Sequence, residues 1–157
     1  MKKTLKNIGI FALLIGLFSF TTVMLKGETK GDDIIGVWEP SNGKARVKIE
    51  KIGNKYFGKI VWLKEPIDPD TKKPKTDKNN PDESMRNTPL KGYRLLKDFT
   101  FSDGKWIDGT IYDPESGTLY SCEITMKKDV LNIRGYVGVK LLGRTDTWKR
   151  LKVKKKK

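Results

Sequence analysis

Histidine is absent from the 157-residue sequence, and cysteine occurs once, as Cys122. The lack of histidine removes the usual general base and the commonest transition-metal ligand, and it excludes Ser-His-Asp and Cys-His hydrolytic centres. A single cysteine excludes an intramolecular disulfide, and its alternation with Tyr120 and Ile124 predicts a buried, unreactive thiol. Several acidic residues could in principle pair for catalysis, but they lie in turns, where Asp caps the backbone; they are Asp77, Asp82, Asp108, Asp113 and Glu115. We therefore expect no catalytic residues, no cofactor and no enzymatic activity.

Acidic residues are few, since 19 Asp and Glu stand against 33 Lys and Arg, and the net charge is +14. Five of the basic residues form a tail over residues 152–157, at Lys152 and Lys154 to Lys157. The tail is either a contact for an anionic membrane surface or a solvated terminus. We expect no nucleic-acid partner, because no aromatic residues alternate with these lysines.

An A-x-A cleavage site is also missing near the amino terminus. Lys2, Lys3 and Lys6 precede an uncharged, largely apolar run over residues 7–25, which is the pattern of an export signal. The run approaches the roughly 20 residues that span a bilayer, so residues 1–27 are either a signal peptide or an uncleaved membrane anchor helix. We expect an exported protein, either periplasmic or membrane-anchored and facing the periplasm.

The rest of the chain alternates short β-strand patterns with turns and predicts one all-β domain over residues 28–151. Ala45, Val47 and Ile49 alternate with charged residues, as in a strand with one buried face. In the next strand Tyr56, Gly58, Ile60 and Trp62 are expected to share a face. The expected strands are 34–38, 44–51, 55–64, 93–101, 106–112, 118–126, 131–136 and 145–151. About eight antiparallel strands are enough to close a barrel with a small interior.

One long segment, residues 65–92, has no sustained strand or helix period and holds five of the seven prolines. Loops this long are functional or disordered, and the many turn-forming residues here favour order. We expect it to cover a barrel wall or mouth, with a helical turn over residues 81–86 capped by Asn80. Asp68, Asp70, Asp77 and Asp82 also suggest calcium, but the EF-hand spacing fails and backbone capping explains the same residues. We therefore expect no metal.

Motifs along the domain resemble one known family. They are an opening G-x-W, then D-x-x-N-P-D, P-L-x-G, W-x-x-G-T-I-Y-D-P, R-G-Y-V-G and L-G-R-T-x-T-W-x-R. In this order they resemble the exported bacterial family catalogued as domain of unknown function 2147. The resemblance implies a calycin-like barrel, similar to lipocalins and fatty-acid-binding proteins, and no established activity. It also implies that Trp38 lies under Arg150, or under Arg144, and closes one barrel end, with Trp148 in the same role.

Six residues are candidates for ligand binding: Trp62, Asp77, Asn80, Tyr112, Arg134 and Tyr136. If Arg134 points inward it is a buried cation that needs an anion, and if it points outward it is a surface residue. The neighbouring glycines leave both orientations open. The leading hypothesis is a monomeric, non-enzymatic carrier or sensor of a small amphipathic or anionic molecule. The alternative is an envelope interaction protein with a filled barrel, which docks to a partner or an anionic membrane through its surface or tail. A carrier needs a cavity of roughly 300 Å³ or more.

Overall fold

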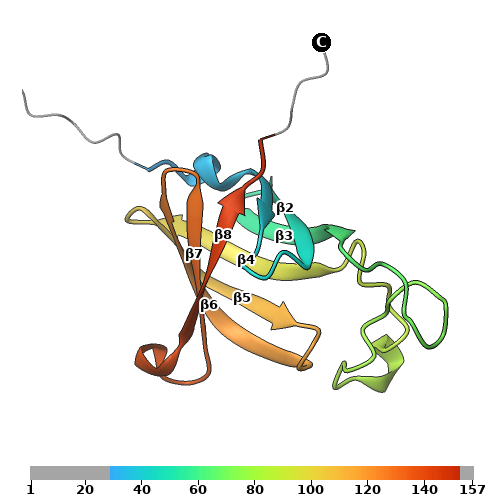
Figure 1. Ribbon diagram of the computed structural model, residues 1–157. Coiled ribbons are helices and arrows are strands. Elements are labelled where there is room, and N and C mark those ends of the chain that lie inside the picture. Colours follow the sequence, from blue (N-terminus) through green and yellow to red (C-terminus); the bar gives the residue numbers. More distant parts are fainter. Residues whose placement is uncertain (1–28, 153–157) are drawn as a thin grey trace, which may run out of the picture.

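The computed structural model describes residues 29–152, which form a closed antiparallel barrel of eight strands in chain order (Figure 1). β1 pairs with both β2 and β8, so the sheet has no free edge between its first and last strands. The strands are β1 Gly36–Glu39, β2 Ala45–Ile52, β3 Lys55–Leu63, β4 Arg94–Ser102, β5 Lys105–Asp113, β6 Thr118–Lys127, β7 Val130–Tyr136 and β8 Arg144–Arg150. The described residues also include three short 3-10 helices: η1 Gly31–Ile34, η2 Glu83–Met85 and η3 Lys140–Leu142. The all-β, eight-stranded prediction is confirmed.

Tight turns set the register between neighbouring strands. Ser102 pairs with Lys105 across a two-residue turn in which Asp103 and Gly104 both have positive φ, at 49° and 74°. Such a turn matches the right-handed twist of the strands that it joins, and Asp-Gly is among its preferred sequences. Because this connection is so short, the bounds that the sequence pattern predicted for β4 and β5 agree closely with the observed ones.

Large side chains fill one half of the barrel. Trp38, Trp106, Phe99 and Leu131 are almost completely buried there. Room for them comes partly from Gly109, where an added Cβ would lie 2.4 Å from the Phe99 ring. Cys122 is buried beside this core, as expected, and burial raises its pKa to about 12. The thiol is therefore protonated at physiological pH.

A β-bulge reverses the expected orientation of Trp62. Val47 pairs with Ile60, but Arg46 pairs with Trp62, so Val61 is an extra residue between the two pairs. Because side chains alternate along a strand, the insertion moves Trp62 to the outer face. Trp62 is 36% exposed, and its ring centroid lies 4.3 Å from the Arg46 guanidinium carbon. The prediction that Trp62 shares a face with Ile60 is wrong.

The segment between β3 and β4 is ordered and extends from one end of the barrel (Figure 1). Two isolated bridges brace it, between Ile67 and Pro74 and between Thr76 and Pro89. The expected helical turn is present as η2, but its cap is Asp82, whose carboxylate accepts the Ser84 N–H at 2.9 Å. Asn80 is not the cap, because its side-chain oxygen already accepts the Asp82 N–H at 2.9 Å in the preceding turn.

The predicted signal or anchor helix, residues 1–27, lies outside the described residues, as does most of the predicted tail, residues 152–157. Within residues 29–152, no helix has the length and apolar character needed to cross a bilayer.

Candidate functional site

The half of the barrel away from Trp38 contains a cavity of about 780 Å³ that opens at the barrel end. Its inner wall is apolar and includes Ile60, Ile111, Ile133 and Trp148. Its rim carries polar and charged side chains, among them Lys44, Asp113, Arg144 and Asp146. The arrangement is that of a pocket for an amphipathic molecule, with an apolar body inside and a polar group at the mouth.

Gly135 is one reason why this half stays open. It lines the cavity, and a Cβ added there would lie 3.4 Å from Tyr120 Cβ and 3.5 Å from Ile111 Cγ2, which are ordinary packing distances. The position has room for a side chain and lacks one. By contrast, Gly109 in the filled half makes room that Phe99 occupies. Gly109 and Gly135 both pair with Cys122, so glycine admits a ring on one side of this residue and leaves room for the cavity on the other.

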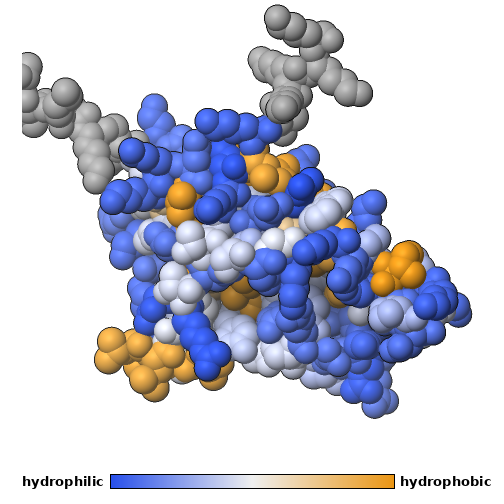
Figure 2. Space-filling view, in the orientation of Figure 1, coloured by the Kyte–Doolittle hydropathy of each residue, from blue (hydrophilic) through white to orange (hydrophobic). Residues whose placement is uncertain are grey.

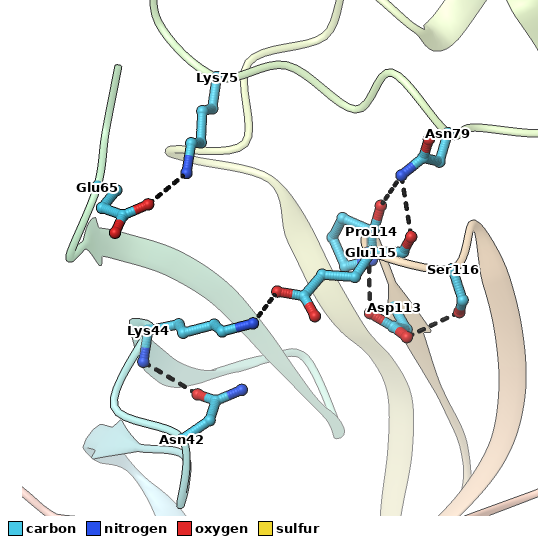
Figure 3. Close-up of polar contacts among 9 residues, drawn as sticks. All are labelled: Asn42, Lys44, Glu65, Lys75, Asn79, Asp113, Pro114, Glu115 and Ser116. Atoms are coloured by element: carbon cyan, nitrogen blue, oxygen red, sulfur yellow. Dashed lines mark hydrogen bonds and ion pairs between the residues drawn. The ribbon is translucent and has the colours of Figure 1, made fainter. Parts of the chain in front are cut away.

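An ion pair spans part of the mouth (Figure 3). Lys44, just before β2, lies 2.7 Å from Glu115 in the β5–β6 turn, and both side chains are mostly exposed. The hydrogen bond to Glu115 raises the pKa of Lys44. In the same turn Asn79, from the long loop, donates to the carbonyl oxygens of Pro114 and Glu115 at 3.2 and 2.9 Å. These contacts join the rim of the cavity to the long loop, and the loop and turn line a second cavity of about 500 Å³.

Asp77 fastens the long loop to the barrel from a fully buried position. One carboxylate oxygen accepts the Tyr112 hydroxyl at 2.8 Å, and the other accepts the Asn80 side-chain amide at 2.6 Å. Asp77 is 1% exposed and Asn80 7%. Both carboxylate oxygens are therefore bonded within the protein, and neither residue lines the main cavity. The structure uses these two ligand candidates as loop anchors.

Tyr112 lies between the loop and the barrel wall. It pairs with Leu119, which is 57% exposed, so its side chain belongs to the outer face of the sheet. It is nonetheless buried, because the long loop covers it and Tyr93 packs on it with ring centroids 5.4 Å apart. Burial and the bond to Asp77 raise the pKa of Tyr112. Tyr112 reaches the cavity at its rim.

Arg134 points outward, which decides between the two orientations left open by the sequence. Its neighbour Ile133 is buried in the barrel, and alternation places Arg134 on the opposite face. The guanidinium donates to the carbonyls of Lys140 and Leu141 at 3.1 and 3.0 Å and to the Thr145 hydroxyl at 3.1 Å. Arg134 therefore holds the β7–β8 connection and does not line the cavity. Tyr136, the other ligand candidate on β7, does line the cavity, near its rim.

The filled end carries the contact that the resemblance implied. Arg150 pairs with Trp38, and its guanidinium carbon lies 4.1 Å from the Trp38 ring centroid. The guanidinium also donates to the carbonyls of Ile35, at 2.9 Å, and Asp33. Arg144 lies elsewhere, at the rim of the cavity, whereas Trp148 is buried in the core, pairs with Leu131 and forms part of the inner wall of the cavity. The indole N–H of Trp148 donates to Asp146 at 2.7 Å.

Sequence reasoning missed several residues of the cavity, chiefly Tyr120, Gly135 and Leu142. Tyr120 could have been found, because it alternates with Cys122 and Ile124 and therefore shares their inward face. Gly135 gives no such signal, because it has no side chain to assign to a face.

Of the acidic residues that suggested calcium, Asp68 and Asp82 accept backbone N–H groups of the loop, and Asp77 binds the side chains of Tyr112 and Asn80. Asp68 accepts the N–H groups of Asp70 and Thr71 at 3.0 and 2.9 Å, which lowers its pKa. Across residues 29–152 there is no group of three or more His, Cys, Asp or Glu side chains placed to hold a metal.

Comparisons with known proteins identify the fold. A family model described as an uncharacterized protein conserved in bacteria (DUF2147) matches residues 36–150. Among solved structures, protein HP1028 from the human pathogen Helicobacter pylori, described as belonging to the lipocalin family, is similar with a TM-score of 0.63 and 25% sequence identity. The match covers 75% of this chain and 82% of that one. No curated protein matches the chain. The barrel is therefore lipocalin-like, as expected.

Proposed function

The chain belongs to the DUF2147 family, for which no activity is described, and we propose that it is a non-enzymatic carrier or sensor of a small amphipathic molecule. The ligand binds in the open half of the barrel, in the periplasm or at a membrane face. The observation that carries this proposal is the cavity of about 780 Å³, which is well above the roughly 300 Å³ that a small ligand needs. The barrel is filled only at the Trp38 end.

The cavity favours a ligand with an apolar body and an anionic group. Ile60, Ile111 and Ile133 offer no hydrogen bonds to the part that enters, so binding there comes from removal of apolar surface from water. At the rim, the side chain of Arg144 makes no ion pair or hydrogen bond within residues 29–152. Lys44 is a second cation, and its exposed pair with Glu115 contributes little stability, so it can open. A carboxylate or phosphate group at the mouth would meet both cations.

The experiment is native mass spectrometry, with organic extraction, of the protein purified from its own envelope. A small molecule that co-purifies at near-equal stoichiometry is expected, and the extract gives its chemical class. Wild-type protein that carries only its own mass, and that binds no added fatty-acid-like molecule, would overturn the proposal.

A matched pair of variants tests the anionic group. Arg144→Gln removes the cation at the rim, and Lys149→Gln removes a cation from an exposed position of the same strand. With 11-(dansylamino)undecanoic acid as the fluorescent ligand, Arg144→Gln should weaken binding at least about tenfold, because a charge-assisted hydrogen bond is worth about 1.5–3 kcal/mol and this one lies at an exposed rim. Lys149→Gln should bind like wild type. Equal losses in both variants would show that only overall charge matters.

A further inference from the structure

The β7–β8 connection exposes the largest aliphatic cluster among the described residues. Val137, Val139, Leu141 and Leu142, here called the apolar loop, are 69%, 61%, 83% and 82% exposed. Figure 2 shows this region as a hydrophobic knob at one end of an otherwise mostly hydrophilic face. Soluble proteins expose single apolar residues freely, but a contiguous cluster marks an interaction site.

Polar contacts behind the apolar loop fix its conformation, while its own side chains pack little. Arg134 binds the carbonyls of Lys140 and Leu141, in η3, and Lys140 forms an ion pair with Glu123 on β6. These contacts hold the backbone of η3 from the barrel side. The leucine side chains are therefore presented to the outside by a braced segment.

The apolar loop is continuous with the mouth of the cavity. Val137 and Leu142 line the cavity together with Gly143 and Arg144. η3 lies at the end of the barrel where β8 begins, whereas β8 ends at Arg150 on the other side (Figure 1). An apolar molecule that moves between the loop and the cavity would meet aliphatic side chains along its way.

The form and charge of this region fit a lipid surface better than a protein. A stable protein interface buries about 800 Å² on each partner and is anchored by aromatic residues, whereas this loop is a narrow projection with aliphatic side chains only. Three cations, Arg134, Lys140 and Arg144, lie at its base, where lipid phosphates would be if the leucines entered the acyl region. One carboxylate, Glu123, pairs with Lys140, so the cations outnumber it there. Apolar residues backed by basic ones are the pattern of segments that bind membrane interfaces.

We propose that the apolar loop inserts into an anionic bilayer and sets the cavity mouth against the lipid. The inference stands apart from the proposed function, because a loop can bind lipid whether or not the cavity holds a ligand. If both hold, the barrel exchanges its ligand directly with the membrane.

The test measures whether the apolar loop lies in water or in lipid when the full-length protein is bound to vesicles. Cys122 is buried and does not compete for label, so Leu141→Cys carries a single environment-sensitive fluorophore (NBD). The matched control is Lys127→Cys, an exposed position at the end of β6, at the opposite end of the barrel. The fluorescence of the label is measured in place of co-sedimentation with vesicles, because the apolar sequence of residues 7–25 is expected to bind lipid by itself.

With vesicles of phosphatidylethanolamine and phosphatidylglycerol, the label at position 141 should shift its emission to the blue and be quenched by nitroxide lipids. The label at position 127 should stay in water. The shift should weaken in pure phosphatidylcholine and at high salt, because the basic residues contribute through screened charge. A label at position 141 that stays in water on protein bound to vesicles would overturn the proposal, and so would equal quenching at the two positions.

A second variant separates insertion from mere closeness to the vesicle. Val139→Cys carries the label in a chain that also contains Leu141→Ser and Leu142→Ser, two exposed positions whose change should leave the circular dichroism spectrum intact. The blue shift seen with Val139→Cys alone should be lost. Leu119→Ser, which removes an exposed leucine from β6, is the control and should keep the shift. A shift that survives the double serine change would refute insertion through the leucines.

Discussion

Replacement of Arg150 by methionine tests whether its guanidinium stabilises the filled end of the barrel. Methionine keeps much of the apolar stem and removes only the charged group. In the structure that group lies 4.1 Å from the Trp38 ring centroid, donates to the carbonyls of Ile35 and Asp33, and forms an ion pair with Asp129 at 3.1 Å. Arg150→Met therefore removes four contacts together.

The expected loss follows from the exposure of each contact. The Arg150 side chain is 22% exposed, so the cation-π contact is worth about 1 kcal/mol, and the two charged hydrogen bonds about 1.5 kcal/mol each, at the lower end of their range. Asp129 is 58% exposed, and an exposed ion pair contributes less than about 1 kcal/mol. Arg150→Met should thus lower the free energy of unfolding by about 3–5 kcal/mol. Asp129→Asn should lower it by less than about 1 kcal/mol.

Urea unfolding, followed by tryptophan fluorescence and circular dichroism, measures both variants in the full-length protein. Arg150→Lys should fall between them, because lysine keeps the charge but cannot direct hydrogen bonds to two carbonyls while it covers the ring. Two results would refute the reasoning: a loss below about 1 kcal/mol for Arg150→Met, or equal losses for Arg150→Met and Asp129→Asn. The second result would mean that the exposed ion pair carries the stability.

Three other predictions use matched residues. Gly135→Leu should weaken binding of the dansyl fatty acid by about tenfold, because the new side chain displaces about two methylene groups of the ligand from the cavity, which costs about 1.6 kcal/mol. Ser121→Leu, on the outer face, should leave binding unchanged, and equal binding by the two variants would exclude the cavity as the site. Tyr112→Phe should lower the free energy of unfolding by about 1.5–3 kcal/mol, because the buried Asp77 carboxylate loses a hydrogen-bond donor. The hydroxyl of Tyr120 has no hydrogen bond within residues 29–152, so Tyr120→Phe should lower it by less than about 0.5 kcal/mol in the same urea assay. Cys122 should react with a thiol reagent at pH 8 at least about a hundredfold more slowly in the native protein than in urea, and fast native labelling would contradict its burial.

The sequence was sufficient for the fold because strand position depends on local patterns. The alternation of Ala45, Val47 and Ile49 and the Asp103-Gly104 turn each act over a few residues, and they locate β2 and the β4–β5 hairpin. The bulge at Val61 has no such pattern, because one added residue changes the face of all that follow without changing the composition of the strand. For that reason the strand was predicted and the position of Trp62 was not.

The candidate site was predicted less completely, because it depends on which distant residues meet. Asp77 and Tyr112 are 35 positions apart and come together only when the long loop folds back onto the barrel. Both residues were identified as unusual, but their mutual bond could not be read from local periodicity. The Trp38–Arg150 contact, by contrast, was accessible through the family resemblance, since both residues lie in its motifs and at the two ends of the domain.

The two ends of the barrel offer different surfaces to a membrane. Leu151 bonds to Val37, and Arg150 bonds to Ile35, so the described chain enters and leaves the barrel at the filled end. The cavity mouth and the apolar loop are at the other end, and strands of 7–10 residues separate the two by roughly 20–30 Å. A bilayer contact where Leu151 leaves the barrel would therefore face the filled end, and a contact through Leu141 and Leu142 would face the mouth. Labels at positions 127 and 141 distinguish these orientations in one experiment, since only the second brings lipid to the cavity.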